Sequence, residues 1–347
     1  MVGSLRPRLY SRWISRWEER LANLDPNREP RPFEWGLDWL GLEPANGHSA
    51  AALAEFSRAN SLRSGEFFSH ATPRDFSLTQ HAEGQTLEFA SPVETPFPEN
   101  NRVYAEYLPA RNHDGRAVLV IPQWNSDERS HISLCRLLNR FGLSALRLSK
   151  AYHHRRKPAG SRRADLHVSS NLGLTIHATR QSVLDARCCL DWLSAQGYHR
   201  LGILGTSLGS CVALLTMAHD HRIKTGVFNH VSLNFSDVVW TGVSCRHVRE
   251  TLEGNVTQQD LVRYWNVISP AAYLNRLAGR GSNHLLVWGA YDTTFRPEYS
   301  RQAIEGFRAN QIPHQVFRLP CGHYTNAKFP YNWMDGLTMS RFLRRHS

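Results

Sequence analysis

The sequence predicts an α/β fold built on a mostly parallel β-sheet with helices on both faces. From Ala117 onward, short and continuous apolar runs alternate with longer segments of helical periodicity. Continuous apolar runs are typical of strands that are buried on both faces, and their alternation with helices indicates a parallel sheet. Three earlier runs between Phe76 and Pro109 are separated by Gly, Pro and Asn and predict antiparallel strands. The nine runs are LTQHA, TLEFA, RVYAEYL, AVLVI, SALRL, LGILG, GVFNHV, HLLVWG and HQVFRL.

Length and composition indicate a folded globule. The chain has 347 residues, of which 41% are hydrophobic and 20% charged, with ten Trp and fifteen Phe. That is too much large apolar surface for a disordered chain. The length allows one large domain or two smaller ones, and no repeat of fixed period is visible.

The net charge of +11 raises the question of a polyanionic partner. Most of this charge is Arg dispersed along the chain, and one dense run stands at residues 153–163. No RNA- or DNA-binding motif surrounds that run, so we expect no nucleic-acid partner. The run itself has two interpretations, a solvated loop or an anion-binding surface near a binding site.

Cysteine usage and hydropathy favour a cytoplasmic location. None of the six cysteines has CxxC spacing, and several fall within apolar helix patterns, as buried free thiols do. We see no secretory signal and no run of about 20 apolar residues. No HExxH or other clustered metal-ligand spacing is present, so we expect neither metal nor cofactor.

Residues 1–75 are expected to form a helical extension packed on the core, and residues 76–347 the main domain. The extension begins with a basic amphipathic helix, because Leu9, Trp13 and Trp17 recur at helical spacing among several Arg. We expect its apolar stripe to dock on the protein's own core or at a dimer contact; peripheral contact with an anionic membrane is the alternative. The oligomeric state is not predicted.

A buried strand, a small-residue turn and a helix follow one another at residues 201–219. The turn reads Gly205-Thr206-Ser207-Leu208-Gly209. A serine on a sharp strand-to-helix turn needs small residues two positions before and two after it, so that strand and helix pass closely. We therefore expect Ser207 to be a nucleophile; a glycine-rich turn without a catalytic role is the alternative.

A serine hydroxyl needs a histidine base, and that histidine needs an orienting carboxylate. Asp292 follows the run HLLVWG, and His323 follows HQVFRL, so both stand at the carboxyl ends of predicted parallel strands. Such ends converge on one crevice. We expect Asp292 and His323 to complete a catalytic triad with Ser207, and Asp237 is the rival acid.

The oxyanion of an acyl-transfer reaction needs two backbone N–H donors. Leu208, directly after the nucleophile, is expected to supply one. The second is expected from the segment IPQWNSD, where Gln123 and Trp124 are both candidates.

Taken together, the segments LVIPQW, GILGTSLG, LLVWGAYD and LPCGHY resemble the α/β-hydrolase superfamily over residues 102–346. QSVLDARCCLDWLSAQGY is similar to a helix of dienelactone-hydrolase-like and acetyl-esterase-like members, and AYHHRRKP to the branch typified by abhydrolase domain-containing protein 18. The resemblance implies an eight-stranded sheet, a small helical cap and a serine esterase working through an acyl-enzyme. Where most relatives have His-Gly in the oxyanion loop, this chain has Pro-Gln-Trp.

The segment between the sixth predicted strand and the acid, about residues 232–281, is expected to form the cap. Its Trp240, Tyr264 and Trp265 would then line an apolar pocket for an ester substrate.

Two alternatives to a serine esterase stay open. One is a peptidase of the prolyl-oligopeptidase type, although no propeller repeat precedes the core. The other is a non-catalytic binding protein that kept the fold.

Overall fold

The computed structural model describes residues 5–24, 28–43, 48–81 and 84–347, with the side chains of α1 described from Leu9 onward. Residues 1–4, 25–27 and 44–47 of the predicted extension lie outside the described part. The strands are β1 (Ser77–His81), β2 (Gly84–Ala90), β3 (Arg102–Leu108), β4 (Arg116–Ile121), β5 (Ser144–Leu148), β6 (Arg200–Thr206), β7 (Ile223–Asn229), β8 (Asn283–Gly289) and β9 (His314–Leu319).

The α-helices are α1 (Leu5–Ala22), α2 (Ser49–Leu62), α3 (Ser64–Phe67), α4 (Ile132–Arg140), α5 (Leu172–Ala195), α6 (Leu208–His219), α7 (Phe235–Thr241), α8 (Arg246–Leu252), α9 (Gln258–Tyr264), α10 (Pro297–Ala309) and α11 (Tyr331–His346). Short 3-10 helices are η1 (Asp38–Leu40), η2 (Pro98–Asn101), η3 (His154–Arg156), η4 (Val243–Cys245), η5 (Asn266–Ile268), η6 (Pro270–Arg276) and η7 (Thr325–Ala327).

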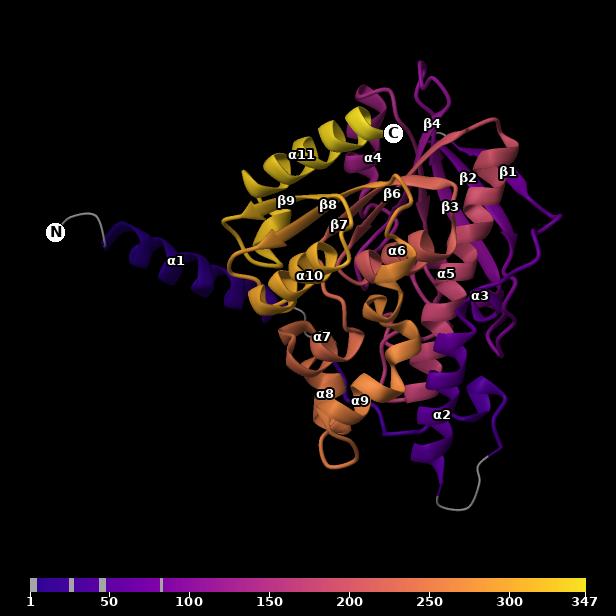
Figure 1. Ribbon diagram of the computed structural model, residues 1–347, viewed down its shortest axis with the longest axis vertical. Helices are drawn as coiled ribbons and strands as arrows, with labels where there is room; N and C mark the ends of the chain where they lie inside the picture. Colours follow the sequence, from indigo (N-terminus) through magenta and orange to yellow (C-terminus); the bar gives the residue numbers. More distant parts are fainter. Residues whose placement is uncertain (1–4, 25–27, 44–47, 82–83) are drawn as a thin grey trace.

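The strands form one nine-stranded sheet in the order β1-β2-β3-β5-β4-β6-β7-β8-β9 (Figure 1). The pairs from β5 to β9 are parallel, whereas β1, β2 and β3 pair antiparallel. The predicted fold class is therefore confirmed, and each of the nine runs overlaps a strand over its described residues. The sheet has one strand more than the eight expected, because β1, exposed along its whole length, adds an outer edge strand to β2.

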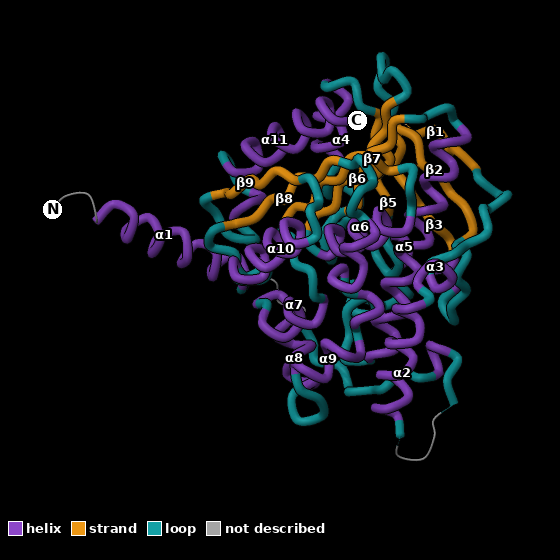
Figure 2. The backbone as a smooth tube through the Cα atoms, in the orientation of Figure 1, coloured by secondary structure: helices purple, strands orange, loops and turns teal. Residues whose placement is uncertain are grey.

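Helices cover both faces of the sheet (Figure 2). Alternate residues of each central strand enter different cores: Leu119 packs with the residues of α5 and α6, and Val118 with those of α4 and α11. This alternation is the period of two expected for a strand buried on both sides. The parallel strands thus have continuous apolar sequences because neither face meets water.

The N-terminal helix α1 projects from one side of the molecule (Figure 1). Ile14, Glu18 and Ala22, four residues apart on one face, are buried against the chain itself. Ile14 joins the core that contains α4 and α11. Trp13 of the same helix stays about half exposed at 52%. None of the helices in the described part of the chain has the length and apolar character needed to cross a lipid bilayer.

The segment between β7 and β8 contains α7, η4, α8, α9, η5 and η6. Figure 1 shows α7, α8 and α9 grouped below the sheet, and α9 packs beside α2 of the extension. The segment predicted as a cap thus contains short helices.

Candidate active site

Ser207 lies on a sharp turn between β6 and α6. Its backbone has φ 58° and ψ −122°, a conformation that non-glycine residues rarely adopt. A Cβ added at Gly205 would come within 2.1 Å of the carbonyl oxygen of Gly209, and one at Gly209 within 2.1 Å of that of Ile121. The two glycines therefore permit the close passage of strand, helix and neighbouring loop that places Ser207 at the carboxyl end of β6.

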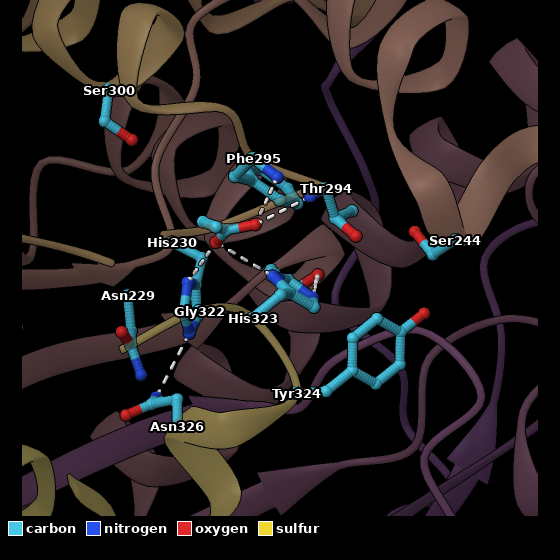
Figure 3. Close-up of polar contacts among 12 residues, drawn as sticks. Asn229, His230, Ser244, Thr294, Phe295, Ser300, Gly322, His323, Tyr324 and Asn326 are labelled. Carbon is cyan, nitrogen blue, oxygen red and sulfur yellow. Dashed lines mark hydrogen bonds and ion pairs between the residues drawn. The ribbon is translucent and has the colours of Figure 1, made fainter. Parts of the chain in front are cut away.

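The three residues predicted to act together are in contact. Ser207 Oγ lies 3.2 Å from His323 Nε2, and His323 Nδ1 lies 3.1 Å from Asp292 Oδ2. The other oxygen of Asp292 accepts hydrogen bonds from the backbone N–H groups of Thr294 (2.8 Å) and Phe295 (2.7 Å), as Figure 3 shows. These bonds fix the carboxylate, which in turn orients the imidazole toward the serine.

The rival acid lies elsewhere. Asp237, in α7, accepts hydrogen bonds from Asn234 (3.0 Å) and Gln258 (2.8 Å). Its partners are thus two amides of the cap region. The position after β8, held by Asp292, is the one in contact with the histidine.

Electrostatics couples Asp292 and His323. Burial alone would raise the pKa of Asp292, but the charge of His323 and the hydrogen bonds from His230 and His323 lower it well below its usual range. Burial alone would lower the pKa of His323, but the Asp292 carboxylate and, to a smaller degree, Glu18 raise it above its ordinary value. The pair therefore favours a carboxylate beside an imidazole that readily accepts a proton.

A second histidine, not foreseen from the sequence, completes the surroundings of Asp292. His230 Nδ1 lies 2.7 Å from the same Asp292 oxygen that contacts His323. Its Nε2 lies 3.1 Å from Asn326 Nδ2, which also donates to Asp335 (2.9 Å). Figure 3 shows His230 beside His323, and their rings are 4.5 Å apart. Since the Asn326 amide donates to Nε2, His230 carries its proton on Nδ1 and donates it to Asp292.

The loop that carries His323 is held by Glu18 of α1. This fully buried carboxylate accepts hydrogen bonds from the backbone N–H of Tyr324 (2.9 Å), the N–H of Thr325 (2.9 Å) and the Thr325 hydroxyl (3.0 Å). A Cβ at Gly322 would come within 2.3 Å of the Glu18 side chain. The N-terminal extension therefore takes part in positioning the candidate base.

The expected oxyanion donors lie at the same place. Leu208 is the first residue of α6, so its N–H has no partner within the helix. Gln123, Trp124 and Leu208 line one pocket with Ser207. The Trp124 indole donates to the carbonyl of Ala164 (2.9 Å) and its ring stacks on His247. Both candidates for the second donor thus border the serine.

The pocket beside Ser207 is largely apolar, but the aromatic lining predicted for it is wrong. Trp265 is fully buried against Phe235 in the core, and Tyr264 packs on Trp35; neither lines the pocket. Trp240 lies under Arg249. The apolar wall consists instead of Trp124, Val168, Leu208, Cys211, Phe235, Val238, Val239, Cys245 and Phe295.

The basic run at residues 153–163 is divided between structural and pocket positions. Arg156 is fully buried and forms an ion pair with Asp185 (2.7 Å). Arg155 lies over the ring of Tyr104. Arg163 lines the pocket and contacts Asp165 (3.1 Å). The solvated-loop interpretation therefore fails for Arg156, because this guanidinium is part of the core.

Two groups of described residues bring three potential metal-ligand atoms within 4.8 Å of one another. One is His230, Asp292 and His323, whose carboxylate already accepts hydrogen bonds from both rings. The other is His70, Cys188 and Asp191, whose carboxylate binds His70, Thr72 and Arg222. In both groups the carboxylate is engaged by protein partners.

Comparisons with known proteins bear on the family and the fold. Residues 85–241 match the family model "Alpha/beta hydrolase domain containing 18", so the predicted resemblance to that branch is confirmed over this segment. No curated protein sequence matches the chain.

Solved structures of low sequence identity share the fold. Acetyl xylan esterase 1 from Thermoanaerobacterium sp. JW/SL YS485 is 13% identical, with a TM-score of 0.57 covering 94% of this chain and 98% of that one. Acetyl xylan esterase from Paenibacillus sp. R4 is 14% identical, with a TM-score of 0.59 covering 95% and 99%. Pyrococcus horikoshii acylaminoacyl peptidase is 12% identical, with a TM-score of 0.58 covering 78% of this chain and 42% of that one. The chain therefore has the α/β-hydrolase fold and, over residues 85–241, the sequence pattern of the family alpha/beta hydrolase domain containing 18.

Proposed function

We propose that this protein is a serine hydrolase that cleaves carboxylic esters through an acyl-enzyme on Ser207. The observation that carries the proposal is the contact of Ser207 Oγ with His323 Nε2, at 3.2 Å, in a pocket-lining position. The esterases among the structures of similar fold support it.

In the first half of the proposed reaction, Ser207 Oγ attacks the ester carbonyl and passes its proton to His323 Nε2. The imidazolium is stabilised by Asp292, which accepts the hydrogen bond from Nδ1. Backbone N–H groups of Leu208 and of Gln123 or Trp124 bind the oxyanion. His323 then protonates the leaving alcohol oxygen, and the acyl group stays on Ser207.

In the second half, water attacks the acyl-enzyme carbonyl. His323 takes a proton from that water, and the tetrahedral intermediate collapses with return of the proton to Ser207 Oγ. The carboxylic acid is released and the enzyme regains its starting state. No cofactor enters the proposed cycle.

The pocket supports an ester with a small apolar acyl or alkyl group. Its cavity measures about 120 Å³, somewhat less than a cavity of roughly 150 Å³ that takes up benzene. Phe235, Val238 and Val239 of α7 supply apolar surface above the serine. We therefore expect activity to fall as the acyl chain of a p-nitrophenyl ester is lengthened beyond a few carbons.

A fluorophosphonate probe tests the assignment of Ser207, because it labels only an activated serine. Wild type should be labelled and Ser207→Ala should not, with an unchanged circular dichroism spectrum. The chain offers a matched control: Ser282 Oγ also lies near a histidine nitrogen, His284 Nε2, at 3.3 Å, away from the pocket lining. Ser282→Ala should keep full labelling. Equal labelling of the Ser207→Ala variant would refute the proposed nucleophile.

Peptide cleavage is the second candidate function, since an acylaminoacyl peptidase is among the similar folds. This chain covers only 42% of that protein. A comparison of kcat/KM for p-nitrophenyl esters and aminoacyl anilides separates the two substrates. Faster turnover of the anilides would favour the peptidase.

A non-catalytic role is the third candidate. It predicts neither probe labelling nor turnover over a broad ester panel.

We propose that the protein is located in the cytoplasm. The proposal is supported by six buried cysteines that are all free in the described part of the chain.

A further inference from the structure

The loop that follows β4 is held by a lysine that no sequence motif singled out. Lys150 lies just beyond β5 and is fully buried. Its Nζ donates hydrogen bonds to the carbonyl oxygens of Pro122 (2.7 Å) and Gln123 (2.9 Å). These carbonyls belong to the segment from which the second oxyanion donor is expected.

The two bonds determine which way the neighbouring N–H groups point. In a trans peptide the C=O and N–H groups point in opposite directions. The Pro122 carbonyl shares its peptide unit with the N–H of Gln123, and the Gln123 carbonyl shares its unit with the N–H of Trp124. With both carbonyls turned toward Lys150, both N–H groups turn away from it. Within the described part of the chain, neither N–H has a backbone hydrogen-bond partner.

The loop that Lys150 holds borders the pocket of Ser207. Gln123 and Trp124 both line the pocket that contains Ser207. The loop backbone also lies beside the first turn of α6, since a Cβ at Gly209 would come within 2.5 Å of the Pro122 carbonyl oxygen. The two residues that carry these N–H groups thus border the pocket of the candidate nucleophile.

We propose that Lys150 is a positioning residue for the oxyanion hole: it holds the carbonyls of Pro122 and Gln123 so that the N–H groups of Gln123 and Trp124 are presented to the oxyanion formed at Ser207. This inference rests on the proposed ester hydrolysis. It also gives a reason why Pro-Gln-Trp can stand where relatives have His-Gly. A lysine side chain fixes the peptide orientation that a glycine would otherwise permit.

A second buried basic side chain holds the other end of the same loop. Arg147 of β5 donates from Nε to the carbonyl of Ser130 (2.8 Å) and from Nη2 to the carbonyl of Asp127. Arg147 and Lys150 therefore fix the segment 122–131 through four of its carbonyl groups. This arrangement pre-orders the loop before any substrate binds.

The clamp does not depend on the charge of Lys150. Burial, followed by the nearby Arg147, lowers the pKa of Lys150 well below its ordinary value. A neutral amine still carries two N–H groups, which equals the number of carbonyls that it binds. The contact to the loop therefore persists in either protonation state.

The variant Lys150→Met tests the inference, because it keeps the length of the side chain and removes its donors. We expect kcat for a p-nitrophenyl ester to fall about 100-fold, the low end of the loss of one oxyanion donor, with KM changed less than about threefold. The discriminating measurement is the ratio of kcat/KM for an ester and its thionoester. Sulfur accepts hydrogen bonds poorly, so a working oxyanion hole favours the oxygen ester, and the variant should lose much of this preference.

Lys157→Met is the matched control, since Lys157 is seven residues further on and donates only to the carbonyl of Arg162 in the described part of the chain. It should behave as wild type. If wild type hydrolyses the ester and Lys150→Met equals it in kcat and in the ester-to-thionoester ratio, the role of Lys150 is wrong and the proposed function stands. If wild type hydrolyses neither compound, both are wrong.

A crystal structure of wild type labelled by the fluorophosphonate gives an answer even if Lys150→Met does not fold. The phosphonyl oxygen should lie within hydrogen-bond distance of the N–H of Gln123 or Trp124, with Lys150 on both carbonyls. A phosphonyl oxygen that points away from this loop, or carbonyls turned off Lys150, would overturn the inference.

Discussion

The carboxylate of Glu18, near the start of the chain, accepts a hydrogen bond of 2.9 Å from the backbone N–H of Tyr324, the residue next to His323. It also binds Thr325 through backbone and hydroxyl. A helix outside the sheet therefore fixes the loop that carries the candidate base. Its charge also contributes to the raised pKa of His323.

Glu18→Gln is expected to lower kcat/KM for esters by about tenfold, because an amide can accept only through one oxygen and the loss of a hydrogen bond to a charged group costs about 1.5–3 kcal/mol. Removal of the negative charge also disfavours the imidazolium. The pKa of His323 falls, and the acidic limb of the kcat/KM profile moves to lower pH.

Glu19→Gln is the matched control, since Glu19 is the exposed neighbour in the same helix. It should leave both the rate and the pH profile as in wild type. A Glu18→Gln variant with lower stability but an unmoved acidic limb would contradict an influence of Glu18 on His323.

The role of Ser207 could be predicted from the sequence, whereas the role of Glu18 could not, and the difference has a physical cause. Ser207, Asp292 and His323 each follow a strand that its apolar run identifies, and parallel strands bring such positions to one edge. Glu18 and Tyr324 are 306 positions apart, and no motif or periodicity links them. Their contact is decided by how α1 docks on the folded core, which local sequence does not encode.

Lys150 and His230 could not be predicted from the sequence for a related reason. Lys150 follows a predicted strand, as Asp292 does, whereas His230 lies within the run GVFNHV and beyond the end of β7. Neither stands in a motif with a known role. Apolar character is equally ambiguous in the cap: Trp265 is predicted to line the pocket, but its ring is buried in the core instead. Composition predicts that a large ring leaves water, and only the tertiary packing decides whether it lines a pocket or fills a core.

Asp292→Asn is expected to lower kcat by about 10⁴-fold, because an amide cannot stabilise the imidazolium. In wild type the base must be neutral to accept the Ser207 proton. Since its pKa is raised, activity should be lost as the pH falls through a value above the ordinary 6.5 or so. The variant should shift this limb to lower pH. Asp237→Asn, at the rival acid, should keep the wild-type kcat and the wild-type acidic limb of the pH profile. Loss of activity in Asp237→Asn and not in Asp292→Asn would make Asp237 the triad acid.

His230 should stabilise the folded protein through its hydrogen bond to Asp292. His230→Leu removes the donor and leaves a buried carboxylate with fewer partners, so the free energy of unfolding at pH 7 should fall by about 1.5–3 kcal/mol. His230→Asn keeps an N–H near the position of Nδ1 and should recover part of that loss. Urea denaturation of both variants measures the difference. Equal losses would mean that the ring's packing, and not its hydrogen bond, matters.

The buried histidines make the fold sensitive to acid, and His219 gives the cleanest test. Burial lowers the pKa of His219 to about 4, and its ring packs between Phe68 and Tyr273. Between about pH 4 and the ordinary pKa near 6.5, the unfolded chain binds a proton at this position and the folded chain does not. Stability therefore rises with pH across this window, by up to about 1.4 kcal/mol per pH unit for each such group.

His219→Phe keeps an aromatic ring in this apolar site and removes the titration. It also loses the Nδ1 contact to the Leu215 carbonyl. That loss lowers the free energy of unfolding by about 1 kcal/mol at every pH and does not change its slope against pH. Urea denaturation between pH 4.5 and 7.5 should then give a slope lower by about 1.4 kcal/mol per pH unit in the acidic half of the range. His81→Gln, at an exposed histidine of β1, should keep the wild-type slope. An unchanged slope in His219→Phe would show that this imidazole titrates alike in the folded and unfolded chain, and that burial there does not exclude its proton.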